Sequence, residues 1–183
     1  MYRASALLAI RCNISLDDHE RVASEIRLHT IDIRNGSVFL DDEDISSLIR
    51  TTAISDAASV ISSGPPVRRE MVALQREFAE RHDTVAEGRD MGTVVFPGAD
   101  LKVYVIADVA IRVVRRWREI RSRGEDANFD TLLRSQLRRD RRDMNREDSP
   151  LRLSPGAVML DSTLMSISRQ AETVLEMFRE RVE

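Results

Sequence analysis

Three short apolar segments, separated by stretches long enough to form helices, constrain the fold of this chain more than any other feature. The segments are 84–86 (TVA), 101–106 (LKVYVI) and 157–161 (AVMLD). Helical patterns occupy 108–123 and 130–146, and Ser166 is placed to open a last helix. Strands that alternate with helices are typical of a parallel sheet, because each parallel connection needs a crossover of helical length. The sequence therefore predicts an α/β fold.

The part of the chain before these segments reads as mainly helical. Residues 1–12 have the apolar spacing of the end of a helix, and Ser15 followed by Asp18 predicts the capped start of a second one. Further helices are predicted over 51–62 and 65–81, the latter opened by two prolines.

One segment of this region has the pattern of a β-hairpin. Apolar residues at 31, 33, 38 and 40 flank Asn35-Gly36, a pair that readily adopts the left-handed backbone of a tight hairpin turn. We expect the hairpin to belong to an insert over about 30–62, within a single domain of 183 residues.

Nearly all of the positive charge is arginine. Of the 28 basic residues only Lys102 is a lysine, and residues 112–152 hold 13 arginines against 8 acidic residues in a chain of net charge −3. A basic segment in an acidic body indicates that an anion is held at one place, whereas a protein that coats nucleic acid would be basic over a whole face. Arginine suits phosphate because its planar group donates two hydrogen bonds. A GC-rich coding bias is the other explanation of the arginine excess.

The sequence lacks the residues that several kinds of site require. Cys12 is the single cysteine, and His19, His29 and His82 have no ligand spacing, so we expect no metal site. No glycine is followed by lysine, so the phosphate-binding motif G-x-x-x-x-G-K-[ST] does not occur in these residues.

No apolar run approaches the roughly 18–20 residues of a membrane span, and no signal-peptide pattern is present. We expect a cytoplasmic protein.

Two groups of charged residues are candidates for ligand binding. In the run GRDMG, Arg89 and Asp90 follow a predicted strand, and ligands of open α/β sheets bind beyond the carboxyl ends of strands. In the run RRDRRDMNR, Arg139, Asp143 and Arg146 share one face of a helix. The alternative for GRDMG is a turn held by a salt bridge. The alternative for RRDRRDMNR is a solvated helix face with ion pairs.

A third group lies on the helix predicted before RRDRRDMNR. Arg112 and Arg116 are four residues apart on one face, and Arg115 lies next to them. Two arginine-bearing helices joined by a loop over 124–128 could close over a polyphosphate like a lid. A solvated helix that packs through Trp117 is the alternative.

Together these segments resemble the bacterial cytidylate kinase family of nucleoside-monophosphate kinases. The resemblance follows the chain through MYR, LDDEDIS, PPVRREMVALQREF, AEGRDMGTVVFP, RRDRRDMNR and LDST. It implies a P-loop-type α/β fold, a three-layer parallel sheet with helices on both faces. It also implies a nucleoside-monophosphate-binding insert at 30–62 and an arginine-rich helical lid at 112–150. The implied reaction is transfer of the γ-phosphoryl group of ATP, with Mg²⁺, to CMP or dCMP. That reaction needs positioning and charge neutralisation more than a general base.

The resemblance also implies which residues bind the acceptor nucleotide. Tyr2 and Arg3 end the acceptor-site motif, with Arg3 on the CMP phosphate. The cytosine is read by Ser59, Arg68 and Asp90. This assignment agrees with the chemistry, because a carboxylate accepts a hydrogen bond from the amino group of cytosine and repels the carbonyl of uracil.

The remaining implied roles concern the phosphates and the sugar. Arg89 is a second ligand of the CMP phosphate, and Arg139 and Asp143 hold the ribose hydroxyls. Arg146 reaches the sugar or the phosphate. The residues implied to touch the ATP phosphates, which with Arg146 form the catalytic set, are Arg112, Arg115 and Arg116.

The sequence also departs from the family pattern. The family has a strand, a Walker A loop, a helix and a second strand before the motif that ends in Tyr2-Arg3, and this chain begins at that motif. We expect a start-site truncation of a kinase, monomeric, with the 183-residue chain inactive and poorly stable. The alternatives are a non-catalytic pyrimidine-monophosphate-binding module, an arginine-rich RNA-binding protein, and a fold completed by a second chain.

Overall fold

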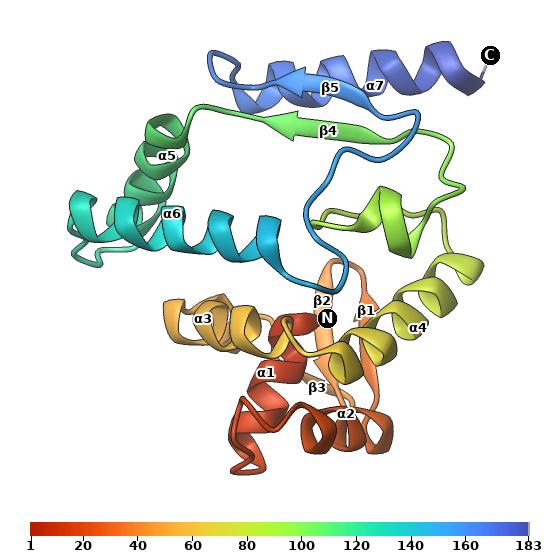
Figure 1. The fold of residues 1–183 in the computed structure, drawn as a ribbon, viewed down its shortest axis with the longest axis vertical. Coiled ribbons are helices and arrows are strands. Elements are labelled where there is room, and N and C mark those ends of the chain that lie inside the picture. Colours follow the sequence, from red (N-terminus) through yellow and green to blue (C-terminus); the bar gives the residue numbers. More distant parts are fainter. Residues whose placement is uncertain (183) are drawn as a thin grey trace. The chain divides into compact units, whose positions relative to one another are not determined.

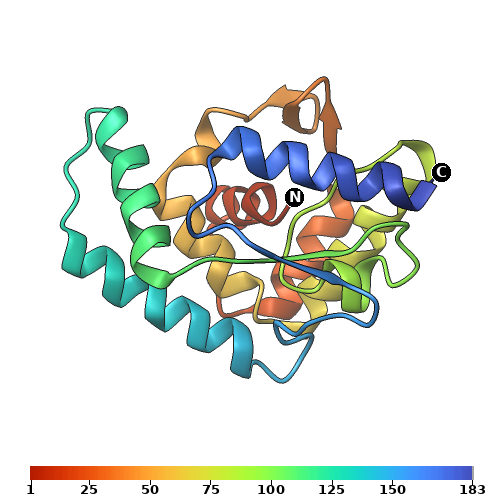
Figure 2. The same ribbon diagram turned by 90° about the horizontal axis from the view of Figure 1, so that it is seen from above.

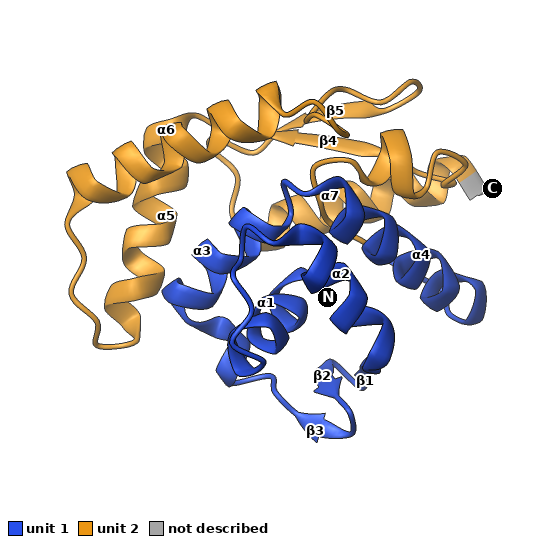
Figure 3. Ribbon diagram, turned by 60° about the horizontal axis from the view of Figure 1, so that its bottom comes forward, with its two compact units in different colours: residues 1–85 blue, residues 86–183 orange. Residues whose placement is uncertain are grey.

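The computed structural model describes residues 1–182, and the chain divides into two compact units, 1–85 and 86–183 (Figure 3). The elements of the first unit are α1 (Tyr2–Arg11), α2 (His19–Leu28), β1 (Ile31–Arg34), β2 (Ser37–Leu40), β3 (Glu43–Asp44), the 3₁₀ turn η1 (Leu48–Arg50), α3 (Thr52–Ile61) and α4 (Pro65–Arg81). Those of the second unit are the π-helical turn η2 (Met91–Val95), β4 (Val103–Ile106), α5 (Val109–Ser122), α6 (Phe129–Asn145), β5 (Val158–Asp161) and α7 (Ile167–Val182).

The first unit is built around a hydrophobic core shared by its helices. α1 packs against α3, and α2 packs against α4. Val22, Ile45, Ile61 and Met71 are almost completely buried between them. Burial of each such side chain stabilises the fold by about 1.5–3 kcal/mol relative to its exposure in the unfolded chain. The core therefore depends on the apolar positions of the predicted helices.

The helix starts in this unit agree with the sequence in all but one case. α3 and α4 begin within one residue of the predicted positions, and Pro65 is the first residue of α4. The predicted cap at Ser15 is wrong. α2 starts at His19, and its N-cap is Asp18, whose carboxylate accepts a hydrogen bond from the amide of Arg21. Ser15 and Asp18 are both good cap residues. The carbonyl of Ser15 instead accepts from the amide of Asp18 in a turn that precedes the helix.

The hairpin lies where the sequence predicts it. β1 and β2 pair antiparallel from Ile31 opposite Leu40 to Arg34 opposite Ser37, and β3 adds a short third strand on β2. Asn35 and Gly36 have φ angles of 50° and 81°, as a two-residue hairpin turn requires. The local sequence alone determines this turn.

Replacement of the turn glycine should destabilise the first unit. Gly36→Ala places a Cβ in the left-handed region, which costs about 1–2 kcal/mol, although nothing lies within 4 Å of the added atom. Gly36→Asn is the matched control, because asparagine adopts this region more readily. Urea unfolding followed by circular dichroism should give the order of stability glycine, asparagine, alanine. An alanine variant as stable as the parent would contradict the expectation.

The second unit contains the predicted parallel strands. β4 and β5 pair in parallel, with Val103 opposite Val158, and α7 runs beside them (Figure 1). The guanidinium of Arg181 in α7 donates to the carbonyl of Asp100 at 3.1 Å, which ties the helix to the chain just before β4. The predicted α/β fold with a parallel sheet and helices is confirmed.

Two long helices of the second unit, α5 and α6, form a helical hairpin (Figure 2). Asp108 caps α5 and Asn128 caps α6 through their side-chain oxygens. The indole of Trp117 donates to the carbonyl of Ala127 at 3.0 Å, which fixes the connecting loop to α5. Among residues 1–182, no helix combines the length and the apolar character that a bilayer crossing requires.

The strand predicted at 84–86 is wrong. Residues 82–87 form no helix or strand, and Val85 is fully exposed. A strand exists only through hydrogen bonds to a neighbouring strand, and within residues 1–182 this segment pairs with none. The turn predicted for GRDMG is the start of η2, for which Asp90 is the N-cap residue.

Candidate functional site

The last two turns of α6 bring together three of the predicted site residues in the second unit. Arg139 and Asp143 are one turn apart, and Arg146 is the C-cap residue of the helix. Asp143 is only 8% exposed. Its Oδ2 accepts a hydrogen bond from Arg89 Nε at 2.8 Å and lies 3.9 Å from Arg139 Nε. The carboxylate of Asp143 therefore joins α6 to the GRDMG segment.

Asp90 is the second buried carboxylate of this group. It is 4% exposed, and its Oδ1 lies 3.8 Å from Nη2 of Arg146. The backbone around it is held firmly, because its carbonyl accepts hydrogen bonds from the amides of Val94 at 2.9 Å and Val95 at 3.2 Å. Arg146 is fixed as well, since its Nε donates to the carbonyl of Ser149 at 2.6 Å. Both charged groups are thus positioned by the backbone.

We call Arg89, Asp90, Arg139, Asp143 and Arg146 the arginine–aspartate cluster. Its three arginines and two aspartates carry a formal net charge of +1. The carboxylates are buried, whereas the side chains of Arg89 and Arg139 are 40% and 46% exposed. An anion from solvent can therefore reach these two guanidinium groups, while the carboxylates can accept hydrogen bonds from hydroxyl or amino groups.

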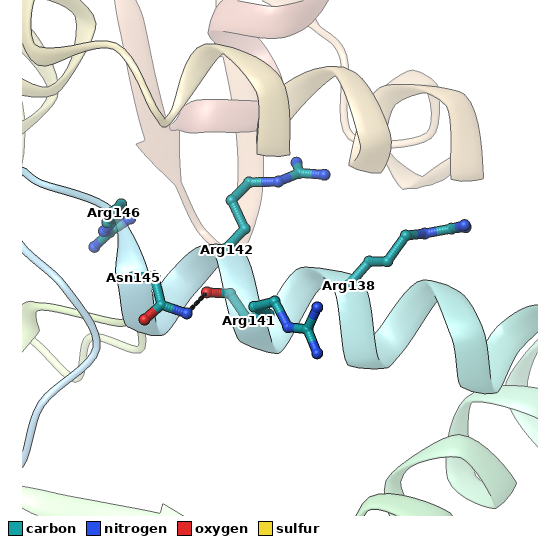
Figure 4. A pocket seen from close by; sticks show the side chains of 5 residues that line it. All are labelled: Arg138, Arg141, Arg142, Asn145 and Arg146. Carbon is teal, nitrogen blue, oxygen red and sulfur yellow. Dashed lines mark hydrogen bonds between the residues drawn. The ribbon is translucent and has the colours of Figure 1, made fainter.

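A shallow hollow of about 400 Å³ lies along the same part of α6. Its lining consists of Arg138, Arg141, Arg142, Asn145 and Arg146. In Figure 4, Arg138 and Arg142 project from the same side of the helix, and Arg146 lies at the end of the helix. The amide of Asn145 donates to the carbonyl of Arg141 at 2.8 Å. Four arginines without a lining carboxylate make this surface attractive to a phosphate.

The sequence reasoning did not single out Arg138, Arg141, Arg142 or Asn145. Their signal was present, because spacings of three, four and seven residues place them on a common side of a helix. The prediction selected the side of α6 that carries Asp143, because Arg139, Asp143 and Arg146 share one helix face and the family resemblance gives them roles. The other arginines of RRDRRDMNR were interpreted only as a concentration of positive charge.

The lid arginines are placed differently from the cluster. Arg112 forms a two-pronged ion pair with Asp140 of α6, at 3.1 and 3.0 Å, and so joins the two helices. Arg115 donates to the carbonyls of Ser162 at 2.5 Å and Met165 at 3.2 Å. Arg116 pairs with Glu119 on the exposed side of α5. Arg112 thus joins two helices and Arg115 holds a loop, whereas Arg116 pairs within α5, so these contacts do not bring the three guanidinium groups together.

The first unit contains the other four predicted residues. Arg68 on α4 is 2% exposed, and its Nη1 donates to the hydroxyl of Tyr2 on α1 at 3.4 Å. Arg3 is exposed and donates to the carbonyl of Ile49 at 3.3 Å. Ser59 is half-buried on α3. The structure therefore brings Tyr2 and Arg68 together, and it fixes Arg3 through η1.

Comparison with known proteins agrees with these features. The family model "Cytidylate kinase" matches residues 1–180. A cytidylate kinase of Solibacter usitatus is 43% identical over 184 aligned residues, which cover 100% of this chain and 79% of that protein. A cytidylate kinase of Paraburkholderia phymatum is 40% identical, over 98% of this chain and 78% of the relative. A cytidylate kinase of Caldanaerobacter subterraneus is 39% identical, over 98% of this chain and 80% of the relative. Because the family model matches nearly the whole chain and these relatives are about 40% identical to it, the chain belongs to the cytidylate kinase family of nucleoside-monophosphate phosphotransferases.

Proposed function

We propose that the arginine–aspartate cluster of this chain binds the nucleoside monophosphate in the reaction of its family, the transfer of the γ-phosphoryl group of ATP to CMP or dCMP. We further propose that these 183 residues, which hold no G-x-x-x-x-G-K-[ST] motif, carry out the transfer poorly on their own. The observation that carries the proposal is the buried carboxylate of Asp143, which accepts a hydrogen bond from Arg89 beside the exposed part of Arg139. A nucleoside monophosphate offers hydroxyls that donate to a carboxylate and a phosphate that accepts from guanidinium groups. The cluster supplies both kinds of partner.

Within the second unit, the proposed roles follow the chemistry of each group. Asp143 and Arg139 hold the ribose hydroxyls, and Arg89 binds the phosphate of CMP. Arg146 reaches the sugar or the phosphate and keeps Asp90 oriented. Asp90 accepts a hydrogen bond from the amino group of cytosine. Because uracil presents a carbonyl at that position, Asp90 would leave it without a donor and discriminate against UMP.

Within the first unit, the proposed ligands are Tyr2, Arg3, Ser59 and Arg68. Arg68 and Ser59 donate to the ring acceptors of cytosine, and Arg3 neutralises charge on the phosphate. The contact of Arg68 with the hydroxyl of Tyr2 supports this assignment, because it helps to orient a buried guanidinium. Buried, pre-oriented donors lose little conformational entropy when the base binds.

ATP is the proposed second substrate, and Mg²⁺ comes with it. Asp90 and Asp143, the buried carboxylates of the cluster, already face arginines, so they do not fit a protein-bound Mg²⁺ site. We infer that the ion is carried by the phosphate oxygens of ATP, which it prefers as hard ligands. Arg112, Arg115 and Arg116 are the proposed donors to these phosphates, and with Arg146 they neutralise the charge of the transferred group.

We further infer that the protein acts as a monomer in the cytoplasm on small nucleotides, without a nucleic acid or membrane partner. A negative net charge of −3 supports this inference, because it disfavours binding to nucleic acid and to anionic membranes. Size-exclusion chromatography with light scattering tests the monomer. A mass of twice 20.8 kDa would contradict it.

The role of Asp90 predicts a change in base selectivity. Asp90→Asn keeps the size of the side chain but adds an amide that can donate to the carbonyl of uracil. Calorimetric titration should show CMP affinity reduced at least tenfold and the preference for CMP over UMP lost. Asp126→Asn is the matched control, because Asp126 also pairs with an arginine but is 95% exposed. If Asp90→Asn keeps the parent's preference, Asp90 does not read the base.

A further inference from the structure

Three side chains with metal-binding donor atoms meet in the first unit, at the end of α1 opposite to Tyr2. Cys12 is the C-cap residue of α1, Glu25 lies near the end of α2, and His29 is the C-cap residue of α2. One donor atom from each lies within 4.8 Å of the other two. Cys12 Sγ is 3.5 Å from Glu25 Oε1, and His29 Nε2 is 3.1 Å from the same oxygen. None of these residues belongs to the proposed nucleotide site.

The two separations that involve Glu25 Oε1 are close to those around a tetrahedral zinc ion. Bonds of about 2.0–2.3 Å at tetrahedral angles place the donor atoms about 3.3–3.6 Å apart. The Cys12–Glu25 distance already matches, and the His29–Glu25 distance needs an increase of a few tenths of an ångström. Glu25 and His29 are about a quarter exposed, which gives an ion from solvent a path to the donor atoms.

A fourth residue holds the imidazole in the orientation that a metal ligand needs. His29 Nδ1 forms a short hydrogen bond with Asp41, which leaves Nε2 facing Glu25. Asp41 is itself fixed, because its other carboxylate oxygen accepts from the amide of Thr30 at 2.8 Å. Histidine ligands of metals commonly donate their second ring nitrogen to a carboxylate, and that partner strengthens the binding of the metal.

We propose that Cys12 Sγ, Glu25 Oε1 and His29 Nε2 bind a Zn²⁺ ion, with Asp41 as the positioning residue of His29 and a water molecule as the fourth ligand. A mixed set of sulfur, nitrogen and oxygen donors suits Zn²⁺ better than the hard ions Mg²⁺ and Ca²⁺. The ion would join the ends of α1 and α2, and through Asp41 the end of the hairpin. Its role is to stabilise the first unit.

Metal binding must displace the thiol proton of Cys12, because the thiolate is the form that binds a metal. Burial, and then the neighbouring Glu25, raises the pKa of the Cys12 thiol, while Arg21 opposes this shift. The hydrogen bond that His29 Nδ1 donates to the carboxylate of Asp41 raises the pKa of His29. Binding releases the thiol proton to solvent, so that Cys12 binds as the thiolate and His29 as the neutral imidazole through Nε2. The hydrogen bond between His29 Nδ1 and Asp41 stays in place.

Cobalt titration of the metal-free, unsubstituted protein tests the site directly, with Co²⁺ as the spectroscopic substitute for Zn²⁺. We expect a thiolate-to-cobalt charge-transfer band and the visible absorption of tetrahedral Co²⁺, both saturating at one equivalent and both removed by Zn²⁺. Zn²⁺ should also protect Cys12 from alkylation by iodoacetamide. Absence of the charge-transfer band together with unchanged alkylation would overturn the proposal without any variant having to fold.

Substitutions of single residues then test which side chains bind the ion. Cys12→Ser should abolish the charge-transfer band, and His29→Gln should abolish tight binding of Zn²⁺. Asp41→Asn should retain the band but bind Zn²⁺ about 10–100-fold more weakly, as expected for an orienting partner. His82→Gln is the matched control, because His82 is exposed and outside the cluster. Parent-like zinc affinity in Cys12→Ser and His29→Gln would overturn the assignment.

Discussion

Asp143→Asn should raise the dissociation constant of CMP by about 10–100-fold, which corresponds to a loss of about 1.4–2.8 kcal/mol of binding free energy. The change keeps the size of the side chain and removes the charge that faces Arg89 at 2.8 Å and Arg139 at 3.9 Å. The two guanidinium groups then repel each other, and the ribose hydroxyls lose a charged acceptor. Calorimetric titration with CMP measures the effect without depending on ATP.

The control for this prediction is Asp126→Asn. Asp126 pairs with Arg121 at 3.1 Å, but its side chain is 95% exposed, so the pair is screened by water. This variant should bind CMP within a factor of two of the parent. Urea unfolding should accompany both titrations, so that loss of binding is not confused with loss of folding. Parent-like CMP affinity in a folded Asp143→Asn protein would reduce the cluster to a structural ion pair.

Gly64→Ala should destabilise the protein by about 1–3 kcal/mol, the usual cost of an added methyl group in a packed region. The Cβ of an alanine here would lie 2.2 Å from His19 Cγ and 2.6 Å from His19 Cβ, so the start of α2 would have to move away from α4. The backbone itself tolerates alanine, because Gly64 has a φ of −81°. The main effect is therefore steric, and the poorer N-cap preference of alanine at the start of α4 adds a smaller cost. Thermal unfolding measures the sum.

A second variant separates this clash from other causes. Gly64→Ala combined with His19→Gly should recover most of the lost stability relative to His19→Gly alone, because the clashing Cβ and ring atoms of His19 are gone. Gly98→Ala is the matched control, since nothing lies within 4 Å of a Cβ at that position. Equal losses from Gly64→Ala with and without His19 would show that the clash is not the cause.

The local elements of the fold could be predicted from the sequence because their signals lie within a few residues. Asn35-Gly36 specifies its own turn, Pro65 opens α4, and Asp108 caps α5 through amides two and three residues away. Local signals fail where two choices are equally good. Ser15 and Asp18 both satisfy the rule for a helix cap, and only the packing of the chain after α1 selects Asp18.

The strand predicted at 84–86 failed for a different reason. Apolar β-branched residues make a segment suitable for a strand, but a strand also needs a neighbour that pairs with it. Pairing is a property of the tertiary structure, and within residues 1–182 only β5 pairs with β4. The fully exposed Val85 shows that side-chain pattern alone does not place a segment in a sheet.

The local pattern of residues indicated the family, the helices and two of the three expected parallel strands, and it marked Arg139, Asp143 and Arg146 through their spacing on one helix. The tertiary structure decided which charges meet. It pairs Asp143 with Arg89, 54 residues away, ties Arg112 to Asp140, and places Cys12 against Glu25. Helical spacing is fixed by covalent geometry and is visible in the sequence, whereas contacts between elements depend on how their apolar faces pack. Only the folded chain therefore shows the arginine–aspartate cluster and the proposed zinc site.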